Sequence, residues 1–191
     1  QPYNNNNNNN NNHLTIPEHH PNTKSNMLCK SALISALALA LALVSVVSAQ
    51  NTVTIIDDTK FCIFLPAPNA DVKTGGTSYC TSAITNADVG LHSTFNTGFI
   101  KTKNIKTKKD YIQVTGRFDR CKHPLSIDDK GSSYDKTFPA SSQCKGYNFY
   151  MQIVEPDLER YCLRCCNDED DCPTGDGGDG CESVMGGDYD L

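Results

Sequence analysis

The chain has 191 residues, and its 17 Lys and Arg against 22 Asp and Glu give a formal net charge of −5. This length favours a single domain, and the negative balance argues against a broadly basic nucleic-acid-binding protein. Ten cysteines are too many for an ordinary cytosolic enzyme. Composition therefore indicates how the chain is stabilised, and it points to no particular activity.

The first 26 residues have the composition of low-complexity sequence. They include nine consecutive asparagines, from Asn4 to Asn12. Such a tract has too little apolar surface to offset the entropy lost on ordering. We therefore expect residues 1–26 to lie outside the folded domain, upstream of a true start at Met27.

Residues 27–49 have the layout of a secretory signal peptide. Lys30 supplies a basic start, residues 32–47 form an uncharged apolar run, and Val47–Ala49 resembles a cleavage site. The alternative is a membrane anchor, because the run approaches the roughly 20 apolar residues that a spanning helix needs. We favour cleavage after Ala49, which predicts a secreted, extracellular protein with no membrane association once the signal is removed.

The segment 50–164 is predicted to be rich in β-strands. Stretches of β-branched and aromatic residues alternate with turn residues. The expected strands are Thr52–Ile56, Lys60–Leu65, Gly98–Thr102, Asp110–Phe118 and Gly146–Glu155. Pro156 and Asp157 predict a turn, after which Arg160–Arg164 returns as the second strand of a hairpin.

Alternation within the last strand of that series predicts which side chains form the core. Tyr147, Phe149, Met151 and Ile153 fall on one face, which we expect to be buried. No window of the exported part shows convincing helical periodicity. The prediction is an all-β or β-dominated small disulfide-stapled domain with long loops.

Nine cysteines follow the predicted cleavage site, and in an oxidising compartment they are expected to pair. We assign eight of them to disulfides, without fixing the connectivity: Cys62, Cys80, Cys144, Cys162, Cys165, Cys166, Cys172 and Cys181. Because Cys165 and Cys166 are adjacent, they point to different sides and are expected to reach different partners.

The odd number leaves one cysteine, and Cys121 is the predicted free thiol, because it lies among charged residues away from the cysteine-dense ends. Such a thiol could form an intermolecular bridge or have no function. Zinc is the alternative for the Cys162-x2-Cys165 pair, but a secreted destination disfavours it. We predict no metal site and no cofactor.

The C-terminal segment 165–191 is Cys-rich and acidic, and it is expected to be docked on the domain by disulfides. It contains nine acidic residues and neither Lys nor Arg. Asp168–Asp171 and Asp176–Asp179 suggest calcium, since hard cations prefer clustered carboxylates. The EF-hand order fails, however, because Cys172 occupies the fifth position of that pattern. We expect a solvated acidic loop.

Five lysines crowd one short stretch: Lys101, Lys103, Lys106, Lys108 and Lys109. Such a cluster can bind phosphate, sulfate or acidic glycans, or it can simply protect a loop or sheet edge from aggregation. Nucleic-acid grooves interleave aromatic residues for base stacking, and only Tyr111 flanks this run. We therefore expect no nucleic-acid partner.

Residues suited to catalysis or to sugar stacking are present, but they form no recognisable motif. His92, Arg117, His123 and Glu155 are the types that a small secreted nuclease uses, yet they fit no known spacing. We therefore predict no catalytic residues and no enzyme activity. Tryptophan is absent, so carbohydrate stacking would depend on tyrosines. The candidates are Tyr79, Tyr134, Tyr150 and Tyr161.

Several longer motifs carry a resemblance to a known family. They are FCIFLPAP (61–68), QVTGRFD (113–119), CKGYNFY (144–150), IVEPDLERYCLRCC (153–166), DCPTG (171–175) and GGDYD (186–190). Together they resemble fungal secreted cysteine-rich proteins often labelled macrophage-activating-glycoprotein-like. The resemblance implies an extracellular or cell-wall protein with the same eight cysteines and no established catalytic activity. Cys121 departs from the family pattern.

The leading hypothesis is a secreted cysteine-rich fungal protein of the cell surface or extracellular space that acts by binding. Its expected partner is a cell-wall glycan or a host-surface component. A dedicated polysaccharide-binding module is one alternative. A small secreted hydrolase that uses His92 or His123 is another.

Overall fold

The computed structural model describes residues 51–173 and 177–190 of the chain. The predicted low-complexity segment 1–26 and signal peptide 27–49 lie outside these residues. Within them, no helix is long and apolar enough to cross a membrane.

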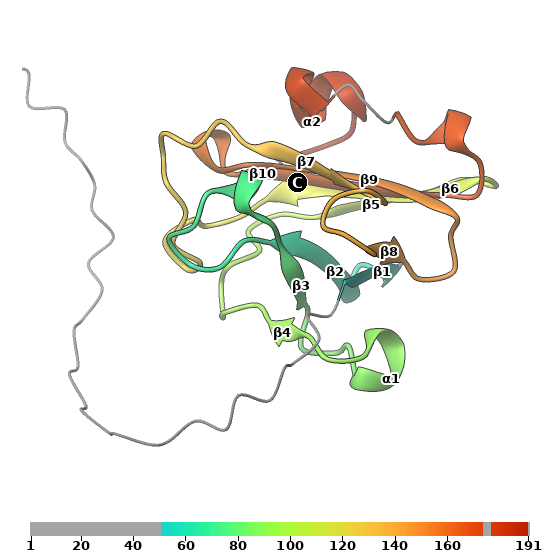
Figure 1. Ribbon diagram of the computed structural model, residues 1–191, viewed down its shortest axis with the longest axis horizontal. Coiled ribbons are helices and arrows are strands. Elements are labelled where there is room, and N and C mark those ends of the chain that lie inside the picture. The colour runs from blue at the N-terminus through green and yellow to red at the C-terminus, as the bar shows by residue number, and fades with distance from the viewer. Residues whose placement is uncertain (1–50, 174–176, 191) are drawn as a thin grey trace, which may run out of the picture. The chain divides into compact units, whose positions relative to one another are not determined.

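The described residues form two five-stranded sheets (Figure 1). The first has the order β4 (Ser93–Thr94), β3 (Thr77–Cys80), β2 (Lys60–Leu65), β1 (Thr52–Asp57) and β8 (Gln143–Cys144). The second has the order β5 (Asn104–Thr107), β6 (Tyr111–Arg117), β10 (Arg160–Cys166), β9 (Phe149–Glu155) and β7 (Ser132–Asp135). All pairs in the second sheet are antiparallel, whereas β8 and β4 join the first sheet in parallel.

Helical structure is confined to single turns. The elements are η1 (Val72–Thr74), α1 (Asn86–Val89), η2 (Pro156–Leu158), η3 (Glu169–Asp171), η4 (Gly177–Asp179) and α2 (Gly180–Val184). The predicted β-dominated, disulfide-stapled fold is therefore confirmed.

The two sheets pack against each other through one apolar core. Phe61 on β2 stacks on Tyr161 on β10, with ring centroids 6.1 Å apart. Phe64 lies between Tyr134 and Tyr150, at centroid distances of 6.0 and 5.8 Å. Because such rings bury large apolar areas, these contacts between the sheets supply much of the drive to form the sandwich.

A glutamine joins the two sheets inside this core. The Gln152 side chain on β9 accepts a hydrogen bond from the Phe64 amide and donates one to the Phe64 carbonyl oxygen, each at 2.7 Å. Gln152 is fully buried. Its amide thus acts as an additional peptide group that satisfies the backbone of β2 where the ladder with β1 has ended.

The outer face of the second sheet is buried as well. Met151, Ile153 and Cys162 form a second cluster with Cys181, Met185 and Tyr189 of the C-terminal segment. Figure 1 shows α2 on the side of β9 and β10 that faces away from β1–β3.

The predicted core face of β9 is therefore only partly right. Tyr150 and Val154 belong to the main core, Met151 and Ile153 belong to the second cluster, and Phe149 is half-buried. A strand covered on both faces has no single buried face for alternation to reveal.

The disulfides link the layers to one another. Cys62–Cys80 joins β2 to β3, Cys144–Cys165 joins the two sheets, Cys162–Cys181 ties β10 to α2, and Cys166–Cys172 closes a short loop. These are the eight cysteines assigned to disulfides from the sequence. Cys165 and Cys166 reach different partners because successive side chains of a strand point to opposite faces.

The expectation of a free thiol at Cys121 does not hold in the structure. Cys121 is disulfide-bonded, and no cysteine among the described residues is free. The expectation rested on the odd count of nine cysteines after Ala49.

Most predicted strands are present, but one is misplaced. Gly98–Thr102 contains only an isolated bridge between Ile100 and Phe118, and the strand begins later, at Asn104. The short strands β3 and β7 were not predicted, because TSYC and SSYD carry little apolar alternation. The predicted domain boundary after residue 164 falls within β10.

Candidate functional site: a lysine-rimmed hollow beside the C-terminal segment

A hollow of about 410 Å³ opens beside the segment that precedes β5. It is lined by Phe61, Thr81, Ile100, Lys101, Thr102 and Lys103. Phe61 is fully buried, while Ile100 and Thr81 are half-buried. Lys101 and Lys103 are exposed. The lining therefore combines apolar residues with two exposed lysines, which we call the rim together with Thr102.

An irregularity in strand pairing shapes this rim. Asn104 pairs with Thr115 on β6, but the bridge before it joins Ile100 to Phe118, so the register shifts by one residue between them. The amides of Lys101 and Thr102 both donate to the Arg117 carbonyl oxygen, at 2.9 and 3.2 Å. Such bulges redirect side chains at sheet edges, and here the redirected residues line the hollow.

Three hydrogen bonds hold the backbone carbonyl and the hydroxyl of Thr102. Its carbonyl oxygen accepts a hydrogen bond from the Tyr161 hydroxyl at 3.1 Å. Its own hydroxyl accepts one from the Arg117 amide at 2.9 Å and donates one to the Tyr189 carbonyl oxygen at 2.6 Å. Thr102 thus connects the rim of the hollow to β10, β6 and the C-terminal segment.

The C-terminal segment Met185–Asp190, which we call the strap, crosses the outer face of the second sheet. Polar side chains of the sheet and its edge bind the strap through its backbone. Gln113 donates to the Gly186 carbonyl oxygen, and Thr115 donates to that of Asp188, at 2.9 and 2.8 Å. Arg164 donates to the Met185 carbonyl oxygen at 2.9 Å.

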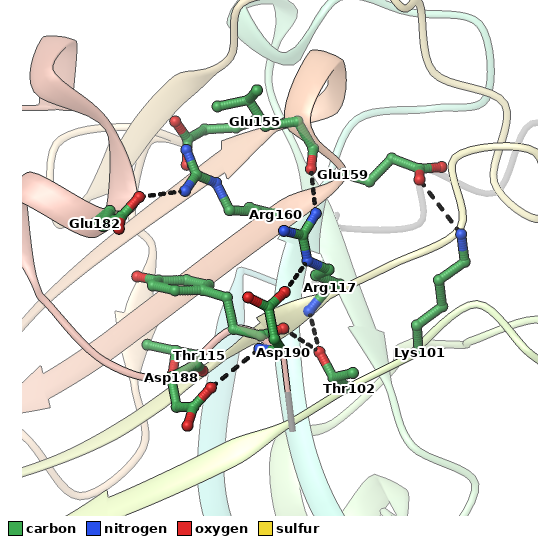
Figure 2. Close-up of polar contacts among 12 residues, drawn as sticks. Lys101, Thr102, Thr115, Arg117, Glu155, Glu159, Arg160, Glu182, Asp188 and Asp190 are labelled. Carbon is green, nitrogen blue, oxygen red and sulfur yellow. Dashed lines mark hydrogen bonds and ion pairs between the residues drawn. The ribbon is translucent and has the colours of Figure 1, made fainter.

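An ion pair anchors the end of the strap. The Arg117 Nε lies 2.6 Å from Asp190 Oδ1. Figure 2 shows Thr102 and Arg117 beside Asp190, with the Lys101–Glu159 ion pair at the edge of the same cluster. The positive charge of Lys101 is therefore partly neutralised by Glu159, whose Oε2 lies 3.3 Å from the Lys101 Nζ.

Close approach between the strap and the sheet explains one of its glycines. Gly187 has φ of 143°, and a Cβ atom there would meet Thr115 Cγ2 at 2.8 Å. Gly116 on β6 has the same role toward the rim, because its Cβ would clash with the Thr102 carbonyl oxygen. Both positions need glycine for the strap and the rim to come this close to β6.

A buried carboxylate lies under the start of α2. Glu155 accepts a hydrogen bond from the Cys181 amide at 3.1 Å and lies 3.6 Å from Arg160 Nε. Burial raises the pKa of Glu155, and the Cys181 amide and Arg160 oppose that shift. Arg160 also donates to Glu182 on α2 at 2.6 Å. These contacts dock α2 and present no reactive group to an open site.

The four residues considered for catalysis serve separate structural roles. His123 is buried, its Nε2 donates to the Pro66 carbonyl oxygen at 2.8 Å, and burial lowers its pKa. His92 donates to the Gly90 carbonyl oxygen at 2.9 Å. Arg117 and Glu155 anchor the C-terminal segment, as described above. No contact in the structure joins either histidine to Arg117 or Glu155 within the described residues.

Three of the four tyrosines predicted as sugar platforms are inaccessible. Tyr134, Tyr150 and Tyr161 are at most 1% exposed. Burial raises the pKa of all three hydroxyls. Tyr79 is half-buried and meets His123 edge-on. The prediction failed because these tyrosines lie on inner faces of the sandwich, where their hydroxyls bind backbone carbonyls or Ser142.

The acidic clusters do not form a recognisable cation site. Among the described residues, no group of three or more His, Cys, Asp or Glu side chains could hold a metal ion. Asp168–Asp171 surrounds η3, where the Cys172 amide donates to the Glu169 carbonyl oxygen at 2.9 Å. Asp176 lies outside the described residues.

Comparison with known proteins adds no assignment. No protein-family model matches the chain, and no curated protein or solved structure matches it significantly.

Sequence reasoning found the lysines of this site but not its other parts. Phe61 and Thr81 come from β2 and the end of β3, so no local motif joins them to Lys101. The sequence of the strap contains one recognisable motif, GGDYD. The structure explains its Gly187 by the close contact with Thr115.

Proposed function

We propose that this is an extracellular protein that binds acidic polysaccharide chains along residues 100–109, at the β5 edge of the second sheet. The observation that carries the proposal is the hollow of about 410 Å³ with Lys101 and Lys103 at its rim. Volumes of this order suit small-molecule binding, and a single acidic sugar unit is of that class.

The charge distribution supports an extended anionic ligand. Lys106 lies on β5, which is an edge strand, and Lys108 and Lys109 follow it. All five lysines of the stretch are exposed, in a chain whose net charge is −5. A concentrated positive patch on an acidic protein attracts polyanions at this edge and repels them elsewhere.

The hollow offers more than charge. The Thr81 hydroxyl accepts a hydrogen bond from the Phe61 amide at 3.3 Å, which leaves its own proton for an oxygen of the ligand. Ile100 offers an apolar contact for the face of a sugar ring. The hydroxyl and the apolar side chain, together with Lys103 and with Lys101, which an anionic ligand would share with Glu159, match a uronate or a sulfated sugar.

Base stacking is not supported at this edge. The only flanking aromatic residue, Tyr111, has the Arg164 guanidinium 4.4 Å from its ring centroid. A nucleic acid would therefore find lysines for its phosphates here, but the one flanking ring already has a cation over one face.

Secretion is supported by the disulfides, by the predicted signal peptide and by the resemblance to fungal secreted proteins. Four disulfides among the described residues are of the kind formed in oxidising compartments. Intact-mass analysis of protein purified from culture medium tests this part of the proposal. A mass that begins at Gln50 supports export, and a chain that retains residues 27–49 in cell lysate contradicts it.

The ligand class is tested with matched polymers. Dextran sulfate and polygalacturonate are titrated into the protein by calorimetry, with uncharged dextran as the control. Both anionic polymers are expected to bind, with affinity falling as salt rises. Preference for one of them identifies sulfate or carboxylate as the recognised group. Equal binding of uncharged dextran, or no binding of either polyanion, refutes the proposal.

Lysine variants locate the binding. Lys101→Gln/Lys103→Gln is expected to weaken binding by roughly ten-fold or more, since each hydrogen bond to a charged group contributes about 1.5–3 kcal/mol. Lys73→Gln/Lys145→Gln removes the same charge from other exposed positions and is the matched control. An equal loss in both double variants would show that net charge, and not this edge, governs binding.

A further inference from the structure

We propose that Thr102 is a positioning residue for the hollow, and that the strap is part of the binding site's support although it does not line the hollow. This inference rests on the proposed function. It concerns how the rim is held, which the lysine variants do not test.

Thr102 has no hydroxyl proton to give a ligand. A threonine hydroxyl carries one proton, and here that proton is donated to the Tyr189 carbonyl oxygen. The hydroxyl oxygen also accepts from the Arg117 amide. Although Thr102 lines the hollow, its polar contacts are directed at the strap and at β6. Its effect on a ligand therefore passes through the positions of Lys101 and Lys103 on either side.

Without the strap, the rim would be held by fewer contacts. The Lys101 and Thr102 amides share the Arg117 carbonyl oxygen, and regular pairing begins only at Asn104. The bond from Thr102 to Tyr189 connects this irregular stretch to a segment that is otherwise well anchored. Tyr189 is 6% exposed, and the Arg160 guanidinium lies 5.6 Å from its ring centroid.

The strap is also held by contacts away from the rim. Thr115, Gln113 and Arg164 bind its backbone from β6 and β10, and Cys162–Cys181 fixes the helix that precedes it. The hydrogen bond from Thr102 to Tyr189 links this strap to the rim. A ligand that requires the ordered rim then favours the docked strap, and by thermodynamic reciprocity the docked strap favours ligand binding.

The test compares three variants for dextran sulfate affinity by calorimetry. Thr102→Val keeps the shape of the side chain but removes both hydroxyl hydrogen bonds. We expect affinity to fall about five-fold, the lower end of typical coupling between sites. Thr102→Ser restores the hydroxyl and is expected to bind within about two-fold of the unmodified protein. Thr115→Val, which removes one strap bond away from the rim, is the matched control and is expected to lose less than Thr102→Val.

Hydrogen exchange supplies a second readout, taken as the change that the ligand causes within each protein, so that differences in stability between variants do not enter the comparison. In the unmodified protein, saturating dextran sulfate is expected to slow amide exchange both at residues 101–103 and in the strap. Thr102→Val is expected to retain ligand-induced slowing near the lysines but to lose it in the strap.

The outcomes separate the two proposals. If the unmodified protein does not bind dextran sulfate, the proposed function fails and this inference fails with it. If binding depends on Lys101 and Lys103 but Thr102→Val binds like the unmodified protein, or Thr102→Ser fails to rescue, only the positioning role is overturned.

Discussion

Two glutamines on opposite faces of the same sheet show how differently its two sides are covered. Gln152 points into the sandwich and binds both backbone groups of Phe64 on the facing sheet. Gln113 points outward, donates to Gly186 of the strap and accepts from Arg164 Nε at 2.8 Å. Both are about 1% exposed or less.

The difference between these faces lies in what surrounds each glutamine. The inner face packs rings such as Phe64, Tyr134 and Tyr150 against the other sheet. The outer face is covered by a smaller apolar cluster that includes Met185 and Tyr189, and by strap backbone held through side-chain hydrogen bonds and one disulfide. We infer that the inner face determines whether the chain folds, whereas the outer face determines whether the strap and the hollow's rim are ordered.

The largest expected effect distinguishes the two layers by their disulfides. Cys144→Ala/Cys165→Ala removes the bond between the sheets, and we expect the free energy of unfolding to fall by about 3–5 kcal/mol. Cys162→Ala/Cys181→Ala opens a loop of similar length, with sequence separations of 19 against 21. It is expected to cost less globally, because the outer layer can detach without opening the core.

Urea unfolding and amide exchange measure both effects. Faster exchange confined to residues 181–190 is expected for the outer pair. If both pairs lower the global free energy of unfolding equally, the layers form one cooperative unit and the comparison fails.

The glutamines themselves give the next effect. Gln152→Leu leaves the Phe64 amide and carbonyl without partners in an apolar core, and we expect a loss of about 2–3 kcal/mol. Gln113→Leu is the matched change on the outer face, and we expect about 1 kcal/mol, because the strap can move to admit water. Urea midpoints of the two variants measure the two losses of stability. A larger loss for Gln113→Leu would contradict the greater importance of the inner face for folding.

A pH effect on stability is expected from the buried side chain of His123. Burial lowers the pKa of His123, so the unfolded chain takes up its proton more readily than the folded one. Stability contributed by neutral His123 is therefore present above its ordinary pKa of about 6.5 and is lost as pH falls. Urea midpoints between about pH 8 and 5.5 should decline in the unmodified protein.

The matched variants separate the two histidines. His92→Gln should keep the decline, and His123→Gln should remove most of it. An unchanged decline in His123→Gln would assign the effect to another group.

Glu155 has a raised pKa, so its contribution has the opposite sign: stability present at low pH is lost as pH rises.

The smallest effect concerns the end of the strap. Arg117 and Asp190 form a close ion pair, but their side chains are 40% and 78% exposed. Asp190→Asn is therefore expected to change the free energy of unfolding by less than about 1 kcal/mol. Thermal melting at low and high salt measures it, and a larger loss would mean that the pair anchors the whole outer layer.

The sequence predicted the parts of the fold that depend on local pattern. β2 begins and ends as expected at Lys60 and Leu65, and the β9–β10 hairpin turns at Pro156 as expected. The strand β5 was misplaced because Asn104, Lys106 and Thr107 give it little apolar alternation, and it is held by pairing with β6. The tyrosines were misjudged because tyrosine occurs both in cores and on surfaces.

The candidate site was only partly predictable. The lysine cluster is visible in the sequence because charge runs are local. The hollow is not, because Phe61 and Thr81 reach Lys101 only through the packing of two sheets. The role of Thr102 depends on a bond to Tyr189, 87 residues away, and no pattern in the sequence indicates such a contact.

The central claim is that ligand binds along the edge from Ile100 to Lys109, and footprinting by amide hydrogen exchange tests it most directly. With dextran sulfate at saturation, we predict slower exchange in residues 100–109 and no change around α1 (Asn86–Val89). Protection centred elsewhere on the two sheets, with residues 100–109 unaffected, would contradict the account.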